Sequence, residues 1–85
     1  MPYIKPVRKE VLEPLVERLA ERCYNAGDLT YVIYALAMKM SAALGKNYKN
    51  LSGLIGCMDC AKTEFYRRIV APYEDQKIEE NGDVE

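Results

Sequence analysis

Apolar residues recur at intervals of three and four along three stretches of this chain, which is the spacing of one face of an α-helix. No segment alternates between apolar and polar residues as a half-buried strand does, so the pattern predicts an all-α protein. The apolar positions are Leu12, Leu15, Val16, Leu19 and Cys23 in the first stretch; Leu29, Val32, Ile33, Leu36, Met40, Ala43 and Leu44 in the second; and Leu51, Leu54, Ile55, Met58, Ala61, Phe65 and Ile69 in the third.

Prolines divide this pattern further. Pro6 and Pro14 each suit the first turn of a helix, so we expect the first stretch to form two helical pieces. Pro72 disfavours helical geometry at the residue before it, which predicts that the last helix is kinked or restarted there. The expected fold is a small helical bundle of three to four helices in one domain, residues 1–85, with a frayed tail at about residues 82–85.

Cap residues predict where the second and third helices begin. Gly27 suits a helix end and Asp28 suits a cap, so the second helix is expected to run from about Leu29 to Leu44. Asn50 or Ser52 can cap the third helix.

The chain is short for a protein that depends on a single hydrophobic core. It has 85 residues and a mass of 9.7 kDa, which is near the lower limit for a domain without disulfides, bound metals or partner subunits. Hydrophobic residues make up 49% of the chain, so a core is expected, but a thin one. A homo-oligomer is therefore the expected state.

Charge narrows the class of partner. The formal net charge is −1, which gives no long-range attraction to an extended nucleic acid or to an anionic membrane. Residues 39–68 are nevertheless net basic and the chain from Glu74 onward is acidic, a reversal that suits head-to-tail self-association or two solvated faces. No apolar run is long enough to span a bilayer, and the opening residues lack a secretory signal, which predicts a cytoplasmic protein.

The cysteines do not indicate a metal or redox site. Cys23, Cys57 and Cys60 are odd in number, and the chain has no histidine to complete a zinc site with them. We interpret them as reduced, packing thiols. The sequence also has no glycine-rich phosphate loop. We therefore expect no cofactor, no metal and no enzymatic activity.

The densest group of chemically capable side chains lies between residues 61 and 77. Lys62, Tyr66 and Arg67 fall near one another on a helix because residues four apart share a face. Cations beside a phenol suit a small anionic ligand, and a tyrosine ring can stack on a planar base. The alternative is an exposed helix face with a Glu64–Arg68 ion pair. The candidate ligand-binding residues are Lys62, Tyr66, Arg67, Tyr73, Tyr3, Lys77 and Arg68.

Both ends of the chain carry a recognisable motif. The opening Met1-Pro2-Tyr3-Ile4-Lys5-Pro6, the run Glu64-Phe65-Tyr66-Arg67-Arg68 and the segment from Ala71-Pro72-Tyr73-Glu74-Asp75 to Asn81-Gly82-Asp83-Val84 resemble a family of short uncharacterised phage and bacterial proteins. The resemblance implies no activity or site. Glu13 stands where the family pattern has aspartate and Cys57 where it has an aliphatic residue.

The resemblance to phage proteins supplies a functional hypothesis. Phages encode small proteins that assemble into homo-oligomers and sequester the nucleotide signals of bacterial immune systems, and this chain is similar to them in size. By analogy with those proteins, we expect a non-enzymatic, anti-defence homo-oligomer in the host cytoplasm that binds an anionic, nucleotide-like molecule through the candidate residues.

Two other functions remain open. A protein-binding adaptor can use the second helix, whose apolar residues exceed what one buried face requires. An all-α, magnesium-dependent nucleotide pyrophosphatase needs two acidic pairs, for which Glu10-x-x-Glu13 and Glu80-x-x-Asp83 have the spacing. Asn81-Gly82 interrupts the second pair, which argues against the enzyme.

Overall fold

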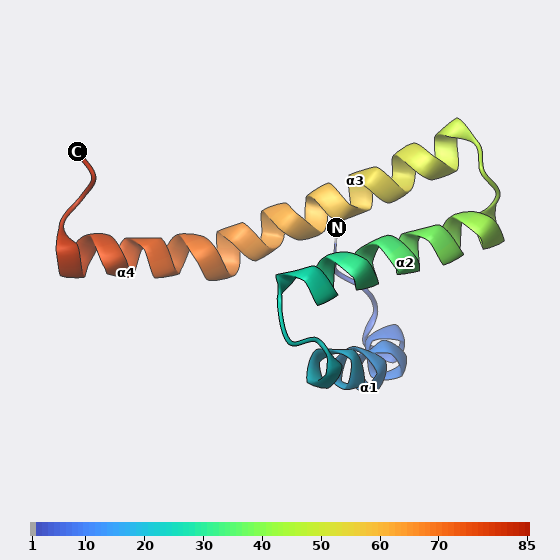
Figure 1. Ribbon diagram of the computed structural model, residues 1–85, viewed down its shortest axis with the longest axis horizontal. Helices are drawn as coiled ribbons and strands as arrows, with labels where there is room; N and C mark the ends of the chain where they lie inside the picture. The colour runs from blue at the N-terminus through green and yellow to red at the C-terminus, as the bar shows by residue number, and fades with distance from the viewer. Residues whose placement is uncertain (1) are drawn as a thin grey trace. The chain divides into compact units, whose positions relative to one another are not determined.

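The computed structural model describes residues 2–85 and places them in helices with short connections and no strand (Figure 1). The elements are α1 (Pro6–Arg22), α2 (Ala26–Leu44), α3 (Tyr48–Phe65), the π-helical turn η1 (Tyr66–Val70) and α4 (Ala71–Asn81). The last three elements follow one another without a break, as one helix of 34 residues. The predicted all-α class is confirmed.

The described chain divides into two compact units, residues 3–54 and residues 55–85, and Pro2 belongs to the second. The first unit holds α1, α2 and the start of α3, and the second holds the rest of α3, η1 and α4. Residues 82–85 follow α4 without helix. The predicted single domain over residues 1–85 stays a prediction.

Helix α1 is one piece, so the prediction of two pieces is wrong. Pro14 lies inside the helix, where its ring nitrogen cannot donate the usual bond to the carbonyl of Glu10. Both residues are exposed, so water can solvate that carbonyl. The helix therefore continues through the proline at a cost in stability rather than ending there.

Helix α2 begins at Ala26, three residues earlier than the sequence predicts. Its cap is Asn25, whose Oδ1 accepts a hydrogen bond from the backbone N–H of Asp28 at 2.8 Å. Asp28 Oδ2 in turn accepts from the backbone N–H of Tyr24 at 2.8 Å. Asp28 thus supports the cap from inside the first turn, where a carboxylate also complements the helix dipole.

Helix α3 begins at Tyr48, and the predicted caps Asn50 and Ser52 lie inside it. Asn47 Oδ1 accepts from the backbone N–H of Asn50 at 2.9 Å and so caps the first turn. The side chain of Asn50 donates to the carbonyls of Leu44 and Gly45, both at 3.0 Å, and so ties the end of α2 to the start of α3. Gly45 has φ 106°, a conformation that favours glycine and ends α2 as predicted.

The disturbance predicted at Pro72 takes the form of the π-helical turn η1. Pro72 has no N–H to continue the α-helical bonding. The backbone N–H of Ala71 instead reaches back five residues, to the carbonyl of Tyr66. One extra residue enters the turn, and the helix continues without a break.

The described residues form no apolar core. Only Ser41 is buried, and its hydroxyl donates to the carbonyl of Met38 at 2.8 Å. Within the first unit α1 is not aligned with α2 (Figure 1) and does not pack along it, so the two helices do not bury each other's apolar faces. The four leucine and valine positions of the predicted α1 stripe are 38–61% exposed: Leu12, Leu15, Val16 and Leu19.

Candidate functional site

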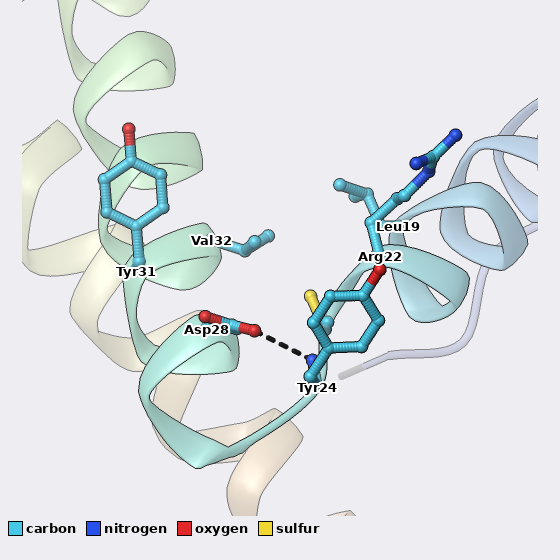
Figure 2. Close-up of a pocket in the computed structure, with 7 residues that line it drawn as sticks. Leu19, Arg22, Tyr24, Asp28, Tyr31 and Val32 are labelled. Carbon is cyan, nitrogen blue, oxygen red and sulfur yellow. Dashed lines mark hydrogen bonds between the residues drawn. The ribbon is translucent and has the colours of Figure 1, made fainter.

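Residues of the connection between α1 and α2 line two adjoining open hollows. The larger has a volume of about 620 Å³ and is lined mainly by apolar side chains of both helices, among them Val16, Leu19, Leu29, Val32 and Leu36. The smaller, of about 390 Å³, shares Leu19 and Val32 with it. In Figure 2, Leu19 and Val32 approach this hollow from opposite helices, and the Tyr24–Asp28 bond closes its base.

The chemistry of the larger hollow suits an apolar partner. Cys23 and Tyr24 complete its lining, and the remaining residues are aliphatic, alanine or asparagine. It therefore offers no cation for a phosphate. A hydrophobic side chain from another helix fits it better than a small anion does.

The basic face of the second unit is organised by one carboxylate. Glu64 Oε1 accepts from Arg67 Nε at 3.0 Å and from Arg68 Nε at 3.0 Å, and it also lies 2.6 Å from Arg67 Nη2. The side chain of Glu64 is 17% exposed, whereas those of Arg67 and Arg68 are 65% and 60% exposed. Two guanidinium groups thus share one carboxylate, which leaves this pair with a net positive charge and open to an anion.

Tyr66 is tied across η1 to α4. Its hydroxyl donates to Glu74 Oε1 at 2.5 Å, a bond between residues eight apart that spans the π-helical turn and Pro72. This hydrogen bond, together with the negative charge of Glu74, raises the pKa of Tyr66 above its ordinary value of 10.0. The phenol is therefore a hydrogen-bond donor already engaged at neutral pH.

A third hollow, of about 540 Å³, lies along α4 and the residues after it. Tyr66 and Tyr73 supply aromatic surface, and Lys77 Nζ lies 5.5 Å from the centre of the Tyr73 ring. Its acidic side chains outnumber that single cation: they are Glu74, Asp75 and Asp83. The hollow therefore repels anions and suits a cation, which can stack on the rings and pair with the carboxylates.

The structure separates the seven candidate residues into groups. Tyr66, Tyr73 and Lys77 line the acidic hollow, and Lys77 also pairs with Glu80 Oε2 at 3.2 Å. Arg67 and Arg68 meet at Glu64. Lys62 lies 3.9 Å from Asp59 Oδ1. Tyr3 is half exposed and belongs to the first unit.

Sequence reasoning missed the organising role of two carboxylates. The Glu64–Arg68 pair has a visible spacing of four, but that spacing does not show that Arg67 binds the same oxygen. Glu74 stands eight residues after Tyr66, and no regular α-helical spacing indicates their contact. The π-helical turn brings them together.

Residues 2–85 contain no cluster of three metal-ligating side chains. None of the helices in the described range combines the length and apolarity that a membrane span requires.

Fold and geometry define a small all-α protein in which most large apolar side chains of the described helices are exposed. The chain belongs to a family described as a domain of unknown function, DUF6899, whose model matches residues 1–84. No curated protein and no solved structure matches the chain.

Proposed function

We propose that this protein is a self-associating, non-catalytic binding protein whose assembled form holds an anionic, nucleotide-like ligand at Arg67 and Arg68. The observation that carries the proposal is the exposure of the apolar faces: no apolar side chain is buried among residues 2–85. Helices of this length are marginal in water unless an apolar face is packed. A second copy can supply that packing.

The ligand class follows from the basic face. Arg67 and Arg68 can each present a planar pair of donors to a phosphate, and Lys62 adds a cation one turn earlier on the helix. The hollow at Tyr73 and Lys77 is a poorer anion site because carboxylates surround it. We therefore place the ligand phosphate at the two arginines, with tyrosine rings of the assembly available for a base.

The resemblance to phage proteins suggests a biological role for such an oligomer. A phage-encoded oligomer of this kind acts in the host cytoplasm by sequestering a nucleotide signal of bacterial immunity. Sequestration needs tight binding and no chemistry, which is consistent with a site built from arginines and phenols.

Native mass spectrometry of the protein purified gently from cells tests self-association and ligand retention in one spectrum. We expect an oligomer that carries a nucleotide-sized mass or acquires one from added cyclic nucleotides. A monomer across micromolar concentrations contradicts self-association. An oligomer that binds no cyclic nucleotide contradicts the ligand and favours the adaptor, for which the apolar hollow beside Leu19 and Leu29 is the docking surface.

Substitutions at Arg67 and Glu64 test the ligand site by isothermal titration with a cyclic nucleotide. Arg67→Ala should abolish binding, whereas the matched change Arg8→Ala on α1 should leave it unchanged. Glu64→Gln should tighten binding about fourfold, because it removes a negative charge about 5 Å from the bound phosphate. Equal affinity in all three variants contradicts the assignment.

A further inference from the structure

The helix that runs through residues 55–81, here called the C-terminal rod, has an apolar stripe with no second helix of its own unit to cover it. Ile55, Phe65 and Ile69 are 59%, 60% and 56% exposed, and Met58 lies between them at helical spacing. Single helices do not hold such stripes open in water without loss of stability. The stripe is thus a surface that requires a partner.

Charge on the same segment is strongly polarised along its length. Residues 55–70 carry three basic side chains, Lys62, Arg67 and Arg68, against two acidic ones. Residues 71–85 carry six acidic side chains against Lys77 alone. The rod therefore has a net charge of about +1 in its first half and about −5 from its second half to the end of the chain.

This polarity decides how two copies can lie together. Parallel pairing sets six carboxylates of one copy against six of the other, and the resulting repulsion is largest where the helices are closest. Antiparallel pairing sets the acidic half of each copy against the basic half of its mate, and a two-fold axis then repeats every favourable contact.

We infer that the C-terminal rod binds the same rod of a second copy in antiparallel orientation, with the two apolar stripes in contact and the acidic half facing the partner's basic half. The inference rests on the proposed self-association and adds the surface and the orientation. A second copy is the occupant because this chain itself carries both complementary charges, net basic in residues 55–70 and net acidic in residues 71–85.

The acidic hollow along α4 fits this arrangement. Tyr66 and Tyr73 offer ring faces, and Glu74 and Asp75 offer carboxylates, which together suit a guanidinium or ammonium group. The basic half of the partner copy supplies such groups. The hollow then receives a cation of the second copy, while each copy's Arg67–Glu64 cluster lies near the two-fold axis.

Electron spin distance measurements on the full chain test the orientation. One sample carries a spin label at Glu79→Cys in a chain with the three native cysteines changed to serine. A second carries the label at native Cys60, with Cys23→Ser and Cys57→Ser. A third mixes the two proteins after joint unfolding and refolding. Cys60 lies on the side of the helix away from Phe65, so its label leaves the stripe free.

Antiparallel pairing about the middle of the rod predicts that the mixed sample gains a distance shorter than that in either single-label sample. The two Glu79→Cys labels are then about 33 Å apart along the axis, from a rise of 1.5 Å per residue. Parallel pairing gives the reverse: short distances in each single-label sample and an added spacing of about 28 Å in the mixture. That reverse pattern overturns the orientation while leaving self-association intact. No dipolar coupling in any sample overturns both proposals.

Discussion

Replacing Phe65 by glutamine tests whether the apolar stripe is a surface of the monomer or an interface. Phe65 is 60% exposed in the single chain. If no partner covers it, the change affects stability by less than about 0.5 kcal/mol, and glutamine favours a helix slightly more than phenylalanine does. A monomer should thus tolerate the variant.

A second copy changes the expected magnitude. Complete burial of a phenylalanine side chain is worth about 1.5–3 kcal/mol, so covering the exposed 60% of Phe65 contributes about 1–2 kcal/mol per chain. In a two-fold symmetric dimer the substitution removes this contribution from both chains, a total of about 2–4 kcal/mol. At 1.4 kcal/mol for each factor of ten, the dimer dissociation constant should rise about 30-fold to 700-fold.

The assay is denaturant unfolding at several protein concentrations, because the midpoint of a dimer depends on concentration and that of a monomer does not. Cys60→Gln is the matched control: it introduces the same residue on the same helix, about 140° away from Phe65. We expect Phe65→Gln to change how the unfolding midpoint depends on protein concentration, and Cys60→Gln to leave that dependence unchanged. Equal behaviour of the two variants refutes the reasoning.

Three further predictions follow from single features. Pro14→Ala restores a backbone N–H inside α1, so it should raise the free energy of unfolding by up to about 3 kcal/mol, measured by chemical denaturation. An unchanged denaturation midpoint would contradict this account of α1. The pKa of Tyr66 is higher in the folded protein than in the unfolded chain, so the bond to Glu74 stabilises the fold below pH 10, and this stabilisation is lost as pH rises through the raised pKa. Glu74→Gln should return the pKa of the phenol, measured by carbon NMR, toward 10. Raising NaCl from about 0.01 M to 0.1 M shortens the Debye length from about 30 Å to about 10 Å and should weaken antiparallel association; stronger association would indicate parallel rods.

The caps show how far local reasoning extends. Gly45 and Gly82 end α2 and α4 at about the positions where the sequence predicts the second helix to stop and the tail to begin, because each takes a positive φ that other residues avoid. The start of α2 is set by Asn25 rather than by Asp28. Both are cap-forming residues, so the sequence does not show which of them precedes the helix, and in the structure both accept hydrogen bonds at its start. Such choices depend on bonds that form only once the turn has closed.

Pro14 and Pro72 show the limit of a single rule. Both lack an N–H, yet α1 passes through the first without a change of helix type, and the second follows a π-helical turn. The rule that proline kinks or ends a helix does not distinguish these two sites. The bond between Tyr66 and Glu74 is a product of that turn and was not predictable from spacing.

The sequence by itself determined the all-α class, the three helical stretches and the polarity of charge, because these depend on periodicity and on residue type. Only the tertiary structure decided that α1 and α2 do not bury each other's apolar stripes, that Arg67 and Arg68 share Glu64, and that Tyr73 and Lys77 lie among carboxylates. Periodicity marks the face of a helix that requires burial. It does not specify what covers that face, since a helix of the same chain and one of a second copy satisfy the hydrophobic effect equally.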